Sequence, residues 1–202
     1  MFRRPRIFVL AVATLATVAC AKPPQPQIDA ANAAVSKATA AEASEYAPEA
    51  FSAAHDAQAK LDAELKAQGS KFAMTRSYAD ATKLAAAATA AGDKAASEAA
   101  QRKQAAQTEA STAVVDARAA VQAAETALSG APKGKGSKAD LEALQSDLAA
   151  AKATLGEAET ALNSQHFLAV KAKADAAKEK ATGVKAAVDQ AIQSRQAGRR
   201  KS

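Results

Sequence analysis

The stretch VVDARAAVQAAETALSGAPKGKGSKADLEALQSDLAAAKATLGEAETAL (Val114–Leu162) decides the fold of this chain. Apolar residues recur alternately three and four positions apart before its central loop, and the same spacing resumes after it, which is typical of helices that pack along one face. The first set is Val114, Ala117, Val121, Ala124 and Leu128, and the second is Leu141, Leu144, Leu148, Ala151, Leu155, Ala158 and Leu162. The stretch therefore predicts an antiparallel helical hairpin with its loop at residues 129–137. The facing pairs would be Leu128 with Leu141, Val121 with Leu148 and Val114 with Leu155.

The composition extends this prediction to the whole chain. Aromatic residues make up 3% of it and Trp is absent, while alanine supplies most of the 49% of hydrophobic residues. Alanine has the highest helix propensity but little side-chain area to bury. We therefore expect an all-α protein of elongated helical hairpins or an antiparallel coiled-coil bundle, with no β-sheet. Because so little area is buried per residue, self-association into a homo-oligomer would add burial.

Four helical segments account for the rest of the chain after the N-terminus, and the third of them includes the first arm of the hairpin. The first covers Gln27–Glu45, and Pro48 begins a second that runs to Gln68 before the break at Gly69 and Ser70. A third segment continues from Lys71 to Ser129. Gly92 lies within it, in a region whose apolar residues are all alanine, so we expect bending or fraying there. Asn163 and Ser164 end the second helix of the hairpin, and a last helix covers Gln165–Gln196. Its apolar stripe consists of Phe167, Val170, Ala174, Ala177, Ala181, Val184 and Val188.

The N-terminal sequence MFRRPRIFVLAVATLATVAC (Met1–Cys20) has the features of an export signal. Three arginines precede an apolar run of a dozen residues, Ile7–Val18, which is too short to span a bilayer. The segment resembles a bacterial lipoprotein signal, in which Cys20 would be acylated and become the first mature residue. The alternative is an ordinary signal peptide that leaves Cys20 unmodified. Cys20 is the only cysteine of the chain, so it has no intramolecular disulfide partner.

These features divide the chain into six predicted segments. They are a signal peptide (1–19), a Pro-rich tether (20–27), alanine-rich helices (28–128), a Gly/Lys loop (129–137), the C-terminal helices of the hairpin (138–195) and a basic tail (196–202). Two or more acyl chains would hold the protein stably on a membrane. No Asp follows Cys20, which favours the outer membrane, facing the periplasm, over the inner membrane.

The stretch AEASEYAPEAFSAAHDAQAKLDAEL (Ala41–Leu65) contains a Tyr-Ala-Pro-Glu turn that opens a helix, and after a short break an alanine-spaced helix follows Phe72. With these residues, the segment from Gln27 to about Ala100 resembles a family of uncharacterised alanine-rich bacterial lipoproteins, and the turn is the most specific part of the match. The resemblance implies a helical domain in the envelope and no reaction. Members of that family often carry an OmpA-like peptidoglycan-binding domain downstream, and no such β/α pattern follows here.

The charge pattern points to two candidate contact sites for anionic partners. The net charge is +6, and four basic residues lie among the last eight positions: Arg195, Arg199, Arg200 and Lys201. This tail could be joined to peptidoglycan through Lys201, could bind anionic wall polymers or phosphate headgroups, or could be a solvated tail without a partner. The second candidate is the hairpin loop with Lys133, Lys135 and Lys138. Its spacing does not match a phosphate-binding loop, because Gly136 follows Lys135 where that motif requires Ser or Thr. Export and the lack of interleaved aromatics argue against nucleic acid.

The residues that usually carry catalysis are scarce. His55 and His166 are the only histidines, and neither has a Cys, Asp or Glu at metal-ligand spacing. We therefore predict no catalytic, cofactor-binding or metal-binding residues. The sequence favours a non-enzymatic, lipid-anchored periplasmic scaffold, spacer or tether, whose partners are the membrane and peptidoglycan or envelope proteins. The alternative is a periplasmic chaperone-like or assembly factor that binds client proteins.

Overall fold

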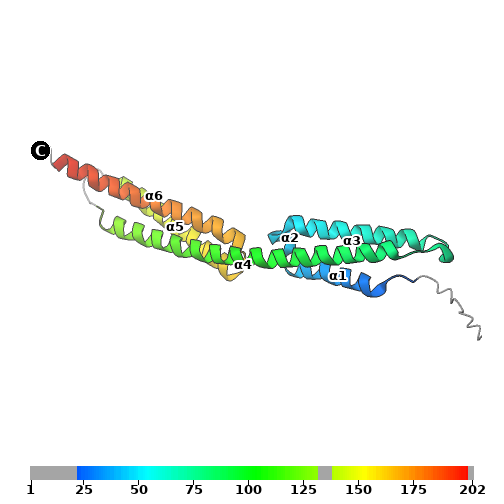
Figure 1. The fold of residues 1–202 in the computed structure, drawn as a ribbon. Coiled ribbons are helices and arrows are strands. Elements are labelled where there is room, and N and C mark those ends of the chain that lie inside the picture. Colours follow the sequence, from blue (N-terminus) through cyan, green and yellow to red (C-terminus); the bar gives the residue numbers. More distant parts are fainter. Residues whose placement is uncertain (1–21, 132–137, 200–202) are drawn as a thin grey trace, which may run out of the picture. The chain divides into compact units, whose positions relative to one another are not determined.

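The computed structural model describes residues 22–131 and 138–199, and every regular element in these ranges is helical. The predicted all-α class is therefore confirmed. In chain order the elements are α1 (Gln25–Ala40), α2 (Ala43–Tyr46), α3 (Pro48–Gly69), the 3₁₀ turn η1 (Ala73–Thr75), α4 (Ala79–Ser129), α5 (Lys138–Asn163) and α6 (Phe167–Arg199) (Figure 1). The chain divides into two units, which we call unit 1 (up to Ala40, and Glu49–Ala96) and unit 2 (Ala41–Pro48, and from Ser97 on). Helix α4 contributes to both.

Unit 1 is built from α1, α3 and the first part of α4. Its core cluster brings Ala31 of α1 and Leu61 of α3 against Ala81, Ala85 and Ala88 of α4, all fully buried. Half-buried residues complete this cluster: Ala57, Leu65, Tyr78 and Leu84. Leu61 is the only buried member larger than alanine. The three helices are therefore held by close backbone approach rather than by large interlocking side chains.

Gly92 shows how close this approach is. A Cβ atom at this position would lie 2.7 Å from the backbone carbon of Ala34 on α1 and 2.9 Å from its Cβ. Helix α4 nevertheless runs without interruption through Gly92, over 51 residues. The expected fraying at this glycine is therefore wrong. The glycine is buried against α1, so its small size serves packing between helices, and the contact offsets its low helix propensity.

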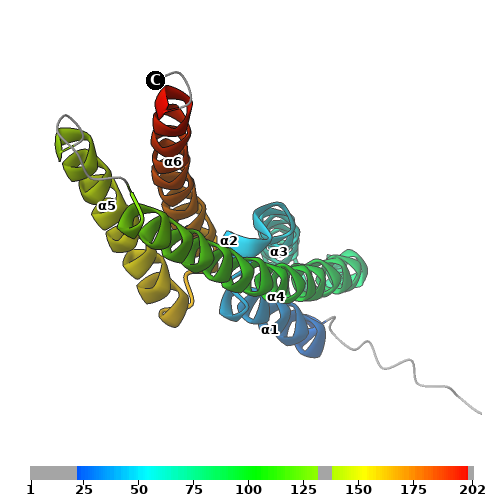
Figure 2. The ribbon, with the colours of Figure 1, turned by 90° about the vertical axis from the view of Figure 1, so that its left-hand side faces the viewer.

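Unit 2 is built from the second part of α4 together with α5 and α6. Arg118 and Glu125 of α4 form ion pairs with Glu159 and Lys152 of α5. A step of seven residues forward on α4 thus corresponds to seven residues backward on α5, so these two helices run in opposite directions. Asp116 of α4 pairs with Lys178 of α6 at 2.8 Å, and Glu157 of α5 pairs with Lys173 of α6. Each of the three helices therefore contacts the other two, and Figure 2 gives a second view of them.

The core of unit 2 follows the apolar spacing of the sequence. Helix α6 buries every residue of its stripe: Phe167, Val170, Ala174, Ala177, Ala181, Val184 and Val188. On α4 and α5 the buried members are Val114, Ala117, Val121, Ala124, Leu148, Ala151, Leu155 and Ala158. The leucines nearest the ends of α5 and α4 are half-buried. The facing pairs expected between the two stripes remain predictions.

The N-terminal boundaries differ from the predicted ones. The tether expected over residues 20–27 is shorter, because α1 begins at Gln25. Pro26 lies in the first turn of this helix, where a backbone N–H would have no intrahelical acceptor and its loss costs nothing. Helix α1 then ends at Ala40, earlier than expected. Glu42 adopts a φ of 57°, in the left-handed region, and this conformation separates α1 from the short helix α2.

The largest difference from the predicted elements lies between α3 and α4. The helix expected from Lys71 begins only at Ala79. The guanidinium of Arg76 donates hydrogen bonds to the carbonyl oxygens of Gly69 (3.0 Å) and Lys71 (2.9 Å), and Phe72 has extended backbone angles. These side-chain bonds satisfy carbonyls at the end of α3 and hold an ordered loop in place of a helical turn.

Helix α6 is longer than expected. It ends at Arg199, so the first residues of the predicted basic tail, from Gln196, are helical. Cations in the last turn of a helix interact favourably with the partial negative charge of its C-terminus, which supports this extension. No helix within the described residues has the length and apolar character needed to cross a bilayer.

Two glycine substitutions test the packing of these helices. We expect Gly92→Ala to destabilise unit 1 by about 1–3 kcal/mol, because the added methyl overlaps Ala34. Gly183→Ala on α6 is the matched control: nothing lies within 4 Å of the position that its methyl group would take, so alanine should raise stability by about 0.5–1 kcal/mol. Urea unfolding followed by circular dichroism measures both. A Gly92→Ala variant as stable as the parent chain would contradict the close contact.

Candidate functional site

The sequence-predicted contact residues are only partly within the described structure. Cys20, Lys133, Lys135, Arg200 and Lys201 lie outside the described residues. Lys138 is the first residue of α5. Arg195 and Arg199 lie in the last two turns of α6, and both are exposed.

These two arginines share one end of unit 2 with the hairpin loop. A cleft of about 550 Å³ is lined by Arg195, Arg199 and Ile192 of α6 together with Gly130, which directly follows α4. A smaller cleft brings Ala131 and Asp140, on either side of the undescribed loop residues, to Arg195. The residues that flank the Gly/Lys loop are therefore neighbours of Arg195, although about 60 residues separate them in the chain. We call these described residues, Gly130, Ala131 and Asp140 with Arg195 and Arg199, the basic end.

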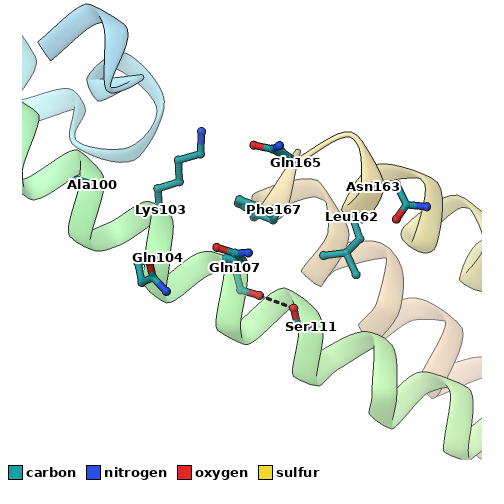
Figure 3. A pocket seen from close by; sticks show the side chains of 9 residues that line it. All are labelled: Ala100, Lys103, Gln104, Gln107, Ser111, Leu162, Asn163, Gln165 and Phe167. Carbon is teal, nitrogen blue, oxygen red and sulfur yellow. Dashed lines mark hydrogen bonds between the residues drawn. The ribbon is translucent and has the colours of Figure 1, made fainter. Parts of the chain in front are cut away.

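A second candidate site is a groove in unit 2 around Lys103. Its volume is about 570 Å³, and it is open to solvent on one side. One wall comes from α4, and the other from the end of α5, the following turn and the start of α6 (Figure 3). The lining residues are Ala100, Lys103, Gln104, Gln107, Ser111, Leu162, Asn163, Gln165 and Phe167.

The turn between α5 and α6 forms the second wall through a Schellman-type helix end. The backbone N–H of His166 donates to the carbonyl of Ala161, and that of Gln165 donates to Leu162, both at 3.0 Å. This motif places Gln165 at a φ of 61°, a conformation that glycine normally supplies. A non-glycine residue in this region costs about 1 kcal/mol, so the strain is borne by a residue whose side chain lines the groove.

Lys103 is held by charge pairing rather than presented to the groove as an isolated cation. Its Nζ lies 2.8 Å from a carboxylate oxygen of Glu42 and 5.9 Å from the ring centre of Tyr46. The hydrogen bond to Glu42 raises the pKa of Lys103 above its ordinary value, so the ammonium stays protonated at neutral pH. Glu42 is the other residue with a positive φ. Of the two non-glycine residues with positive φ in the described chain, Glu42 therefore pairs with Lys103 and Gln165 lines the same groove.

Tyr46 anchors this corner of unit 2. It is 4% exposed, and its backbone carbonyl accepts a long hydrogen bond, 3.4 Å, from Arg102. Its hydroxyl lies close to the backbone of Phe167 but makes no well-formed hydrogen bond there. Burial, followed by the nearby carboxylates of Glu45 and Glu42, raises the pKa of Tyr46 above 10.0.

The chemistry available in the groove is hydrogen bonding. Its amide and hydroxyl groups can donate to and accept from a polar molecule, and no nucleophile is paired with a base among its lining residues. His55 lies elsewhere, exposed on α3, with its ring edge-to-face against Phe51 at 4.5 Å. Within residues 22–131 and 138–199, no group of His, Cys, Asp and Glu could hold a metal ion.

Two exposed apolar residues, Phe72 and Met74, were not expected from the sequence. They are 73% and 75% exposed in the loop between α3 and α4. The spacing placed them in the first turn of a helix, and the sequence showed no obvious exposed apolar patch. The available signal was the break at Gly69 and Ser70 directly before them, which separates them from any helical stripe.

The buried hydroxyl of Tyr46 leads to a test in which removing a polar group is expected not to lower stability. Because this hydroxyl has no well-formed partner, we expect Tyr46→Phe to leave stability at pH 7 unchanged or to raise it by about 1 kcal/mol. A raised folded-state pKa means that the unfolded chain loses its proton first, so this residue lowers stability as pH rises above 10.0. Tyr46→Phe should not lose stability in this way above pH 10.0, because phenylalanine has no proton to release. Urea unfolding at neutral and alkaline pH measures both effects.

Tyr78→Phe in unit 1 is the control, because Tyr78 is half-buried against a different core. A loss of more than about 1 kcal/mol in Tyr46→Phe at pH 7 would mean that the hydroxyl is hydrogen-bonded.

Comparison with known proteins adds no assignment. No protein-family model matches the chain, and neither does any curated protein or any solved structure. The resemblance of Ala41–Leu65 to alanine-rich lipoproteins therefore remains a hypothesis.

Proposed function

We propose that this chain is a non-enzymatic scaffold of the bacterial envelope, held on a membrane by a lipid on Cys20 and bound to an anionic wall polymer through the basic end of unit 2. The observation that carries the proposal is the convergence at that end. Arg195 lines clefts with Gly130, Ala131 and Asp140, the described residues on the two sides of the Gly/Lys loop, and this supports one shared contact for the two basic segments.

The electrostatics of the basic end suit a polymer with repeated negative charges. Arg195 and Arg199 are exposed in the last turns of α6. The sequence of the loop segment and of the C-terminal tail adds five more basic residues: Lys133, Lys135, Lys138, Arg200 and Lys201. Each basic residue near an anionic surface contributes about 1 kcal/mol, and several act together at low ionic strength. Binding of this kind requires no pocket that encloses its ligand.

The anchor is supported by the N-terminal sequence. Basic residues, a short apolar run and small residues lead to Cys20, which lies five residues before the start of α1. A signal that ends in a modified cysteine gives the single thiol of an exported protein a defined role. The lack of Asp after Cys20 supports placement in the outer membrane, with the helices in the periplasm.

The helical architecture supports a scaffold rather than an enzyme. One continuous helix, α4, supplies residues to both units, and the cores consist mainly of alanine. The groove at Lys103 offers hydrogen bonds, and the one cation among its lining residues is paired with Glu42. None of these features brings reacting groups together, whereas a scaffold needs only stable helices and two attachment points.

The lipid anchor is tested by replacing the sulfur of Cys20 with oxygen. We expect Cys20→Ser to move the protein from the membrane fraction to the soluble fraction, because a serine cannot accept the diacylglyceryl group on sulfur. Mass spectrometry of the mature N-terminus of the parent protein should find an acylated Cys20. Lys22→Ser is the control and should remain membrane-bound. A Cys20→Ser protein that stays as firmly attached would remove the lipid anchor from the proposal.

The basic end is tested by sedimentation with purified peptidoglycan sacculi. We expect Arg195→Gln with Arg199→Gln to weaken binding by about tenfold or more at low salt, from about 1 kcal/mol for each charge. The control is Lys180→Gln with Lys185→Gln, which removes two charges from the same helix away from its end. If both double variants bind equally well, or if the parent protein does not sediment with sacculi, the wall contact is excluded.

A further inference from the structure

The loop between α3 and α4, residues 70–78, presents two neighbouring apolar side chains to solvent. Phe72 and Met74 are the most exposed large hydrophobic residues of the described chain, ahead of Val115 at 61% and Leu168 at 51%. Single exposed apolar residues are common on soluble proteins. Phe72 and Met74 are two residues apart in the same loop, and we call this pair the apolar tip.

Hydrogen bonds within the loop hold this tip in place. Besides its two bonds from Arg76, the loop is tied to α3 by Gln68, which is 5% exposed and accepts a hydrogen bond from the backbone N–H of Ser77 at 3.1 Å. The hydroxyl of Thr75 donates to the carbonyl of Phe72 at 2.9 Å. The loop therefore satisfies several of its backbone groups internally, as a segment that leaves bulk water must.

The loop sequence itself carries charge of one sign, and the nearest acidic residues along the chain, Glu64 and Asp80, lie in the flanking helices. Between Leu65 and Ala79 the sequence contains three basic residues and no acidic one: Lys66, Lys71 and Arg76. Lys71 is exposed directly beside Phe72. Basic residues that flank exposed apolar side chains match the surface of a bilayer that contains anionic lipid, where charge attracts the segment and the apolar side chains enter the boundary below the headgroups.

The tip also lies at the end of unit 1 where the chain enters. Helix α1 packs against α3 through a 2.8 Å hydrogen bond between Gln58 and Asn32, and its start lies at the same end of unit 1 as the loop (Figure 1). Cys20 is five residues before Gln25. Five residues span at most about 18 Å, so a membrane that holds Cys20 is near this end of the unit.

We propose that the loop at residues 70–78 is a second membrane contact, in which Phe72 and Met74 insert into the headgroup boundary of a bilayer and Lys71 lies among its phosphates. The position of the bilayer rests on the proposed anchor, while the exposure and charge of the tip do not. Attachment at Cys20 alone would not fix the orientation of unit 1. A second contact at the same end would fix how its helices leave the membrane.

The absence of tryptophan from the chain makes a direct test simple. The anchored protein carrying Phe72→Trp is purified from envelopes and reconstituted into vesicles of phosphatidylethanolamine and phosphatidylglycerol. We expect the emission of this tryptophan to shift to shorter wavelength and to be quenched by lipids brominated on their acyl chains. The matched control is Val115→Trp, an exposed position on α4 in unit 2, which should show neither effect.

A second pair of variants separates the loop from the anchor. In a Cys20→Ser background, Phe72→Ser with Met74→Ser should bind the same vesicles several-fold more weakly than the background alone, with unchanged helicity because both side chains are exposed. The control, Val115→Ser with Leu168→Ser, should not change binding. If Cys20→Ser has no effect on flotation of the protein with envelopes, the anchor fails and the loop proposal is still measured by the tryptophan signal.

Three results would overturn the membrane contact. The first is an unshifted, unquenched tryptophan at position 72 in protein that floats with the vesicles. The second is a shift that depends on protein concentration without lipid, which would assign the tip to a second copy of the chain. The third is a shift caused by an unfolded outer-membrane protein and not by vesicles, which would favour the chaperone-like alternative.

Discussion

The close approach of alanine-faced helices is the constraint on which both units depend. Alanine buries little area, so each contact layer stabilises weakly, and stability must come from many layers with backbones near van der Waals contact. The contact between Gly92 and Ala34 is the tightest described case, since not even a methyl group fits there. Small side chains also fill much of the core of unit 2, where Val170 and Val188 are the largest side chains that are fully buried. Stability therefore requires long, regular helices, because only they repeat a small contact in many layers.

Such weakly directional cores need another source of specificity, and charged residues supply it. Ion pairs connect α4 with α5, α4 with α6 and α5 with α6 along the borders of the apolar stripes. Their side chains are largely exposed, so each pair contributes at most about 1 kcal/mol to stability. Alanine stripes fit one another in several registers, whereas opposite charges seven residues apart favour one. The lowered pKa of Glu157, caused by its hydrogen bond to Lys173, is a sign of this pairing.

The sequence predicted the helices and the buried stripes of unit 2 because both depend on local spacing. All seven stripe residues of α6 are buried, and α5 ends at Asn163 as expected. What it could not predict depends on contacts between distant residues. Nothing in the sequence near Gly92 indicates that Ala34 lies against it. The low helix propensity of glycine therefore predicts fraying, although the structure uses this glycine for close packing. The loop after Gly69 depends on Arg76 reaching back to two carbonyls. The neighbourhood of Arg195 with Gly130 and Ala131 emerges only when the end of α6 lies beside the end of α4.

The shared helix α4 limits how this chain can change over time. The division between the two units falls inside it, near Ala96, with no loop at which length could vary. One residue inserted or deleted within the stretch of α4 that packs on α5 and α6 would turn every later residue of the helix by about 100° about its axis. The stripe residues on the two sides of the change would then no longer share one face. A change in length therefore disrupts a whole stripe, whereas a substitution alters one contact layer.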